Sequence, residues 1–185
     1  MSSDKPQSKP GSFKALRPYL ILGVLLIAAD QITKVLAVRF LKGQSAFVLI
    51  DGVFELRYLE NTGIAWGMFS GTQYIFAACA ALVVILILIV LTWIPADRHF
   101  FVMKLCLAVL GAGAAGNMID RILRGYVVDF FYFSLIDFPI FNVADCFVTV
   151  SGIILIIILL FKYDDADLDM IFGKKSEKKS ADKAD

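Results

Sequence analysis

Two aspartates in the second half of the chain have the surroundings that acid–base chemistry requires. Asp129 lies between two valines and the aromatic run 130–133, and such an apolar setting raises the pKa of a carboxyl group by desolvation. Asp145 follows Asn142, a good helix N-cap, by three residues, so free backbone N–H groups and the helix dipole favour its ionised form. Such a pair could hydrolyse a bond, because one carboxylate takes a proton from water while its protonated partner donates to the carbonyl group.

Structural explanations exist for the same two residues. Asp145 could be no more than the acidic member of a capping box with Asn142. Asp129 could be a loop carboxylate paired with Arg121 or Arg124, which are near it in the sequence. The residue types and their spacing leave both interpretations open.

Lys34 follows Asp30 by four residues, which places the two side chains on one helix face in the favourable order for an ion pair. We interpret this pair as support that allows a charge within an apolar helix, and not as reacting groups.

The glycines at 111, 113 and 116 match G-x-G-x-x-G, but no strand precedes them. Small residues inside an apolar segment instead indicate close helix packing.

The elements that hold these residues follow from hydropathy. Hydrophobic residues make up 59% of the 185 residues, well above the share in a soluble domain. Since about 20 apolar residues cross the hydrocarbon core of a bilayer, we predict four membrane-spanning helices, at 18–37, 73–94, 100–118 and 143–161. The predicted fold class is an all-α membrane protein. No A-x-A cleavage site follows the first span, so we expect it to be retained.

Lysines and arginines in the short flanks predict the orientation. We expect both polar tails, 1–17 and 164–185, to be disordered and cytoplasmic. The cytoplasmic side would then contain the basic residues of the amino tail, together with Arg98 of the turn after the second span and Lys162 after the fourth. The outer connections also contain arginines. The domain 18–163 would thus have both termini in the cytoplasm.

The first outer connection is too long for a simple turn. Asp51-Gly52 lies between two β-prone runs, which is a hairpin signal. We therefore predict a small extracytoplasmic β-sheet within about 43–67. Trp66, Phe69 and Trp93 are suited to anchoring at the membrane interface.

Other common chemistries have less support. Ser134 and Ser151 are present, but the only histidine, His99, is expected on the cytoplasmic side. Cys146 lies beside the anion of Asp145, which makes it a poor nucleophile. The three cysteines lack C-x-x-C spacing and one histidine is too few for a zinc site, so we expect no metal. A net charge of +1 leaves no basic surface for nucleic acid.

Because successive helices alternate in direction, the polar residues gather at one membrane level. A convergent polar site near one interface predicts a functional site. Its members are Asp30, Lys34, Asn117, Asp120, Arg121, Asp129, Asn142 and Asp145. The main alternative, an ion- or proton-coupled transporter, predicts charges along a path across the bilayer, whereas the inner halves of the spans contain few. A second alternative is a non-enzymatic scaffold, in which the polar residues only brace helix ends.

Five short motifs occur in order along the chain. They are Asp30-Gln-x-x-Lys34, Asn61-x-Gly-x-Ala-Trp66, Gly116-Asn-x-x-Asp-Arg121, Val127-Val-Asp-Phe130 and Phe141-Asn-x-Ala-Asp145. Together they resemble the motifs of the bacterial lipoprotein signal peptidases (signal peptidase II), a family of aspartic peptidases in the inner membrane. The resemblance covers the chain from about residue 30 to residue 146.

The resemblance implies that Asp129 and Asp145 are the catalytic dyad. It implies a supporting or substrate-binding role for Asp30, Lys34, Asn61, Gly63, Asn117, Asp120, Arg121, Asn142 and Ala144. Asn117 and Arg121 would hold the substrate or the dyad, and Asp120 would be structural beside Arg121.

The resemblance also implies the substrate, a prolipoprotein whose cysteine carries a diacylglyceryl group and which is cleaved just before that cysteine. The outer sheet and the turn 61–66 would cover the scissile bond. Globomycin is the implied inhibitor, and no cofactor is implied. We expect a monomer among membrane lipids, in the bacterial inner membrane, with its active site near the periplasmic face.

Overall fold

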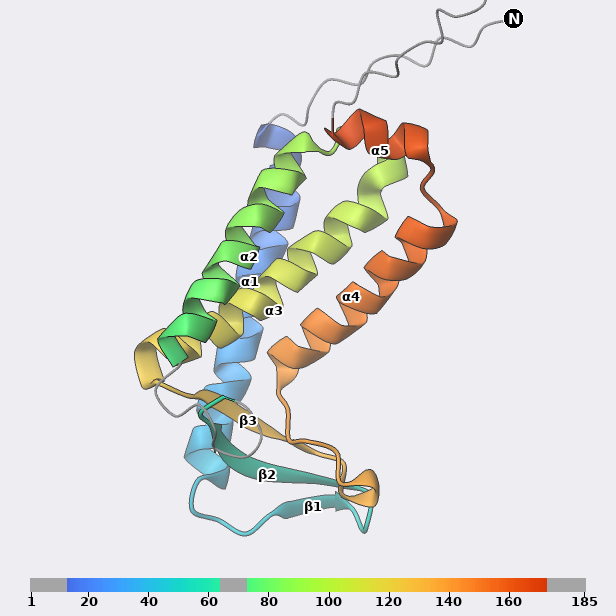
Figure 1. Ribbon diagram of the computed structural model, residues 1–185. Coiled ribbons are helices and arrows are strands. Elements are labelled where there is room, and N and C mark those ends of the chain that lie inside the picture. Colours follow the sequence, from blue (N-terminus) through green and yellow to red (C-terminus); the bar gives the residue numbers. More distant parts are fainter. Residues whose placement is uncertain (1–12, 64–72, 173–185) are drawn as a thin grey trace, which may run out of the picture.

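Four long helices lie side by side and form the body of the protein (Figure 1). The computed structural model describes residues 13–63 and 73–172. Helix α1 comprises Phe13–Leu41, α2 Gln73–Trp93, α3 Phe101–Arg124 and α4 Val143–Phe161. All four are long and apolar enough to cross a membrane. The predicted fold class, four membrane helices with a small sheet, is confirmed.

Two of the helices extend beyond the predicted spans. Helix α1 continues to Leu41, and Pro18, expected at its start, lies inside it. Helix α3 continues to Arg124, where Gly125 ends it with a left-handed backbone (φ 76°) and donates its N–H to the carbonyl oxygen of Arg121 at 3.2 Å. Hydropathy marks the hydrocarbon region, whereas a helix continues into the interface until a residue caps it.

Helix α3 lies at the centre of the bundle and packs against α1, α2 and α4. Glycines allow these close approaches. A Cβ atom on Gly113 would lie 2.6 Å from the carbonyl oxygen of Ala144, and one on Gly116 would lie 2.5 Å from Oδ2 of Asp30. The glycine motif is thus used for helix packing, as predicted.

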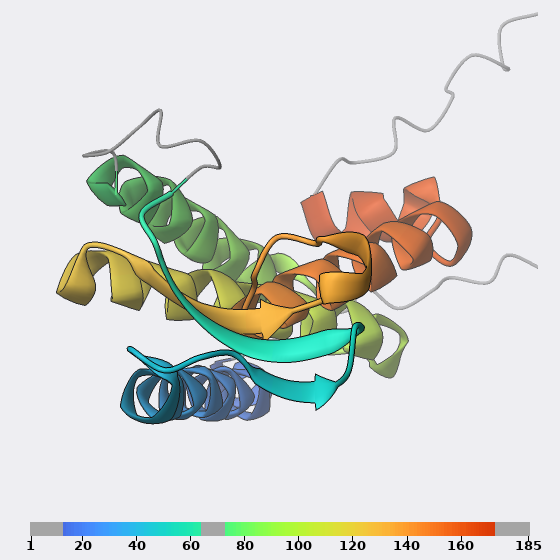
Figure 2. The ribbon, with the colours of Figure 1, turned by 90° about the horizontal axis from the view of Figure 1, so that it is seen from below.

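An antiparallel sheet in the order β1-β2-β3 lies across one end of the bundle (Figures 1 and 2). Its strands are β1 (Phe47–Ile50), β2 (Phe54–Asn61) and β3 (Val127–Tyr132), and the short helix η2 (Ser134–Ile136) follows β3. The turn at Asp51-Gly52 joins β1 to β2 as predicted, with Gly52 at φ 66°.

The third strand was not predicted. Asp129, expected in a loop, lies in β3 and pairs with Leu59 of β2. The partner strand is distant in sequence, and no hairpin signal connects the two, so the local pattern could not reveal this pairing. Val128 and Phe130 pack with Ala37 of α1 in a small core, and strand alternation directs the side chain of Asp129 to the opposite face.

The opposite end of the bundle is closed by helix α5 (Asp165–Phe172) and the short helix η1 (Arg98–Phe100) (Figure 1). Residues 165–172 were expected to belong to a disordered tail, and that expectation is wrong. Ile171 and Tyr163 are buried with Phe100 in the main core, and Nε2 of His99 lies 3.0 Å from Oδ2 of Asp167. Burial of these side chains offsets the cost of ordering the segment.

Some predictions fall on residues that the structure does not describe. The proposed interfacial anchors Trp66 and Phe69 lie outside the described residues, as do the tail segments 1–12 and 173–185. Trp93, the third anchor, is exposed at the end of α2 and meets the ring of Phe172 edge-on, with 6.2 Å between the ring centroids.

Candidate active site

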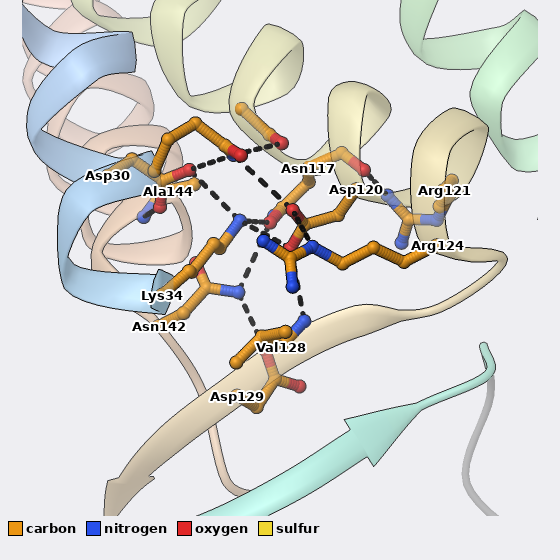
Figure 3. A network of polar contacts seen from close by, with 12 residues as sticks. Asp30, Lys34, Asn117, Asp120, Arg121, Arg124, Val128, Asp129, Asn142 and Ala144 are labelled. Carbon is orange, nitrogen blue, oxygen red and sulfur yellow. Dashed lines mark hydrogen bonds and ion pairs between the residues drawn. The ribbon is translucent and has the colours of Figure 1, made fainter. Parts of the chain in front are cut away.

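Asn142 joins the two aspartates of the predicted pair. Its side-chain amide donates to Oδ1 of Asp129 at 2.6 Å (Figure 3), and its backbone N–H donates to Oδ2 of Asp145 at 3.1 Å. Asp129 comes from β3 and Asp145 from the first turn of α4. Two carboxyl groups from separate elements therefore meet at one buried residue.

Asn142 holds this position because it is the N-cap of α4. Its backbone is extended (φ −132°, ψ −176°), and its Oδ1 accepts the N–H of Asp145 at 3.0 Å, which completes a capping box. The cap uses the amide oxygen, so the amide nitrogen must face Asp129. The capping interpretation of Asp145 is correct but incomplete, because its Oδ1 also accepts from Nδ2 of Asn117 at 2.8 Å.

Asp129 is held by a second amide on its other oxygen. Nδ2 of Asn61 donates to Oδ2 of Asp129 at 2.8 Å. The N–H of Gly63 donates to Oδ1 of Asn61 at 3.0 Å, which fixes the orientation of the amide, and the φ of 91° at Gly63 favours glycine. Within the part of the chain that the structure describes, no ion pair joins Asp129 to Arg121 or Arg124, so the ion-pair alternative is wrong.

Burial raises the pKa of Asp129 to about 6, in the direction that the sequence predicted. The negative charge of Asp145 contributes to this rise in pKa, and the hydrogen bonds from Asn61 and Asn142 oppose it. The residue is only 1% exposed. A carboxyl group with this pKa can carry a proton close to neutral pH, as a general acid must.

A buried lysine organises the polar residues next to the pair (Figure 3). Nζ of Lys34 lies 2.9 Å from Oδ2 of Asp30, which confirms the predicted ion pair, and 3.2 Å from Oδ2 of Asp120. It also donates to Oδ1 of Asn117 at 2.8 Å. Because the oxygen of this amide is occupied, its nitrogen faces Asp145. Lys34 thus sets the orientation of the Asn117 amide, which binds Asp145.

Asp30 and its neighbour Gln31 connect three helices. Its Oδ1 accepts the N–H of Ala144, in the first turn of α4, at 3.0 Å. The side-chain amide of Gln31 donates to Oδ2 of Asp30 at 3.1 Å and to the carbonyl oxygen of Gly116, in α3, at 3.2 Å. These contacts tie α1 to α3 and to the start of α4, where Asp145 lies.

Asp120 connects α3 to β3. It accepts the N–H of Val128 at 3.1 Å, one residue before Asp129. Its other oxygen lies 3.4 Å from Nε of Arg124. Its neighbour Arg121 donates instead to the carbonyl oxygen of Asn117, at 3.2 Å.

Comparison with known proteins identifies the family. The family model for signal peptidase (SPase) II matches residues 22–161. The chain belongs to the signal peptidase II family. A lipoprotein signal peptidase of Clostridioides difficile is 38% identical over 77% of this chain and 95% of the relative. One from Symbiobacterium thermophilum is 42% identical over 71% of this chain and 87% of the relative.

Two solved structures, each described as a bacterial membrane enzyme determined by the in meso method, are also similar. One, at 2.3 Å resolution, is 29% identical, with a TM-score of 0.70 over 92% of this chain and 98% of that chain. The other, at 1.9 Å resolution, is 32% identical, with a TM-score of 0.71 over 84% and 98% of the two chains. This member of the signal peptidase II family is therefore a peptidase that crosses a bacterial membrane several times.

The hydrogen bonds and ion pairs of the candidate site in this signal peptidase II chain include every site residue that the sequence motifs indicated. Two further residues, Gln31 and Arg124, also take part. Gln31 was part of a quoted motif but had no predicted role. Arg124 follows Asp120 by four residues, and this helical spacing could have revealed the pair. Among residues 13–63 and 73–172, no group of three His, Cys, Asp or Glu side chains could hold a metal ion.

Proposed function

We propose that this protein is an aspartic endopeptidase in which Asp129 and Asp145 form the catalytic dyad. The family supports its general function, the removal of signal peptides from lipoproteins. The observation that carries the assignment of the dyad is the bridge through Asn142, whose side-chain amide and backbone N–H each bind one of the two carboxyl groups. Paired carboxyl groups in different surroundings are suited to act as acid and base.

The proposed chemistry starts with one proton on the pair. Asp129 holds it, since burial raises its pKa to about 6. Asp145 takes a proton from a water molecule as the water oxygen attacks the scissile carbonyl carbon, and Asp129 gives its proton to the carbonyl oxygen. The tetrahedral intermediate then breaks its C–N bond. The leaving amine takes the proton from Asp145, and the new hydroxyl group returns one to Asp129.

The proposed substrate is a prolipoprotein whose cysteine carries a diacylglyceryl group, and the bond before that cysteine is the one cleaved. Each buried methylene of an acyl chain contributes about 0.8 kcal/mol to membrane binding. The modified cysteine therefore stays at the bilayer, and the dyad must be near the interface. Its position, where α4 begins and the sheet meets the helix ends, supports this (Figure 1).

We place the sheet and the dyad on the periplasmic side of the inner membrane and both termini in the cytoplasm. Lys14, Arg17, Arg98 and Lys162 lie at the opposite end of the helices, near α5. Basic residues in short flanking segments favour the cytoplasmic side.

Arg121 and Asn61 are proposed to contact the substrate beside the dyad. The guanidinium of Arg121 lies over the ring of Phe76, 5.9 Å from its centroid, and uses one nitrogen for a backbone carbonyl. Its other N–H groups are suited to peptide carbonyls. The sheet and the turn after Asn61 are proposed to cover the scissile bond, although residues 64–66 of that turn lie outside the described residues. Since one chain supplies both carboxyl groups, we propose that the protein acts as a monomer.

The test is cleavage of a purified, lipid-modified prolipoprotein by Asp129→Asn and Asp145→Asn variants in mixed micelles. We expect each variant to lose at least about 100-fold in kcat, the usual contribution of a general acid or base, while still inserting into membranes. Asp137→Asn is the matched control, because Asp137 is exposed and bonds only Tyr132 among the described side chains. Near wild-type turnover by either dyad variant would remove that residue from the dyad.

A further inference from the structure

An apolar groove lies between α1 and α2, on the side of the bundle nearer to α5. Its walls are residues 19–27 of α1 and 84–91 of α2, and its floor is formed by small residues of α3, Ala108, Gly111, Ala112 and Ala115. The space within the groove is about 570 Å³, part of which is open to the surroundings of the protein. Because α1 and α2 make few contacts with each other, residues 13–63 and 73–172 do not fill this space.

The length of the groove indicates what kind of molecule it binds. Its lining covers eight residue steps of α1 and of α3, or about 12 Å at 1.5 Å for each residue. This length is close to one leaflet, roughly half of the 30 Å hydrocarbon core. A helix that crosses both leaflets needs about 20 residues, so it would extend well beyond this lining. An acyl chain of one leaflet matches the length of the lining.

The positive charge of Arg17, at the end of the groove, favours a lipid with an anionic headgroup. Arg17 lies on the same helical stripe as Leu20, Val24 and Ile27, just beyond the end of the lining. It is exposed, and within residues 13–63 and 73–172 it makes no ion pair. A guanidinium binds phosphate through paired hydrogen bonds. The amino end of a signal peptide is basic, so Arg17 would repel it and attract an anionic lipid.

We propose that this groove binds one acyl chain of an anionic phospholipid, from the leaflet at which α1 begins, with its phosphate at Arg17. The far end of the groove is Ala115, next to Gly116, where α1 and α3 meet at Asp30. A bound chain fills the gap between α1 and α2 and steadies α1 at the level of the buried ion network. Because the lipid binds only the folded protein, it stabilises the fold.

The acyl chain is tested by filling the groove. A Cβ atom on Gly23 would meet nothing within 4 Å, so Gly23→Phe and the smaller Gly23→Leu place a side chain in the groove without moving the backbone. Ala29→Phe is the matched control, because Ala29 is exposed on the opposite face of α1. Native mass spectrometry of the full chain, with added phosphatidylglycerol, should show at least tenfold weaker lipid binding for the Gly23 variants and no change for the control.

The headgroup is tested by charge. Wild-type protein should bind phosphatidylglycerol at least fivefold more tightly than phosphatidylcholine, and Arg17→Gln should abolish this preference. Lys14→Gln, an exposed neighbour on α1, should retain it. A preference that survives in Arg17→Gln would overturn the proposal. So would Gly23 variants that bind lipid normally but cleave the precursor slowly, because that result would assign the groove to the signal segment.

Discussion

Replacing Asp129 by asparagine should stabilise the folded protein at neutral pH while abolishing cleavage. Asp129 is 1% exposed, and burial raises its pKa to about 6. Because the folded-state pKa lies above that of the unfolded chain, the carboxyl group favours folding while it is protonated. This contribution is lost as the pH rises from about 3.8 to about 6. At higher pH the folded protein carries a buried charge that asparagine lacks.

The size of the effect follows from two opposing terms. The difference between 3.8 and about 6 corresponds to about 3 kcal/mol in the free energy of unfolding. Asparagine still accepts from Asn142, but it turns an NH₂ group toward the amide of Asn61, whose orientation Gly63 fixes. The loss of that hydrogen bond costs about 1 kcal/mol. The net gain is about 2 kcal/mol above pH 6, or about 4–8 °C in Tm for a chain of this length.

The measurement is thermal unfolding in detergent micelles at pH 4 and pH 8, followed by tryptophan fluorescence. Asp129→Asn should unfold at a higher temperature than the wild type at pH 8 and at nearly the same temperature at pH 4. The exposed-site control Asp137→Asn should show no such dependence on pH. An equal Tm difference at both pH values, or a variant less stable at pH 8, would refute the assignment of a raised pKa to this carboxyl.

Three further predictions concern the groups around the pair. Lys34→Met leaves two buried carboxylates without their shared cation and should cost about 3–5 kcal/mol of stability; a Tm within 2 °C of the wild type would contradict this. Gly116→Ala, whose Cβ would lie 2.5 Å from Oδ2 of Asp30, should cost about 1–3 kcal/mol, whereas Gly152→Ala, with its nearest atom at 4.0 Å, should not destabilise; equal Tm values for both would argue against tight packing. Asn142→Ser keeps a helix cap but removes the amide that binds Asp129 and Asn117, so kcat should fall about 100-fold and Tm by a few degrees, since each lost hydrogen bond costs about 1 kcal/mol; unchanged kcat would exclude a positioning role.

The parts of the fold that depend on local patterns were predictable from the sequence. Each membrane helix is an apolar run of sufficient length, and the hairpin is marked by Asp51-Gly52 between β-prone segments. Strand β3 depends on a partner far away in the sequence, and α5 depends on packing against a core built from three other segments. Neither dependence leaves a periodic signal in its own residues.

The contacts of the candidate site also include some that the sequence could predict and some that it could not. The cap at Asn142, with Asp145 at the third helical position, and the pair of Lys34 with Asp30 have helical spacing, so the sequence predicted both. The backbone contact from β3 to Asp120 could not be predicted, because the strand itself was not. The orientations of the asparagine side-chain amides could not be predicted either, because each depends on which neighbouring group donates a hydrogen bond to the amide oxygen.

The distribution of cations separates the supporting carboxylates from the two that we propose to react. Asp30 and Asp120 share the ammonium of Lys34, and Asp120 also meets Arg124. The hydrogen bonds to the proposed catalytic pair, Asp129 and Asp145, come from amides and backbone N–H groups, which are neutral. A neutral donor orients a carboxylate without cancelling its charge, so two such groups held together favour retaining one proton between them. A lysine in the place of Asn142 would favour ionisation of both groups and remove the proposed general acid, so amides around the pair, with the cations one contact away, suit the proposed chemistry.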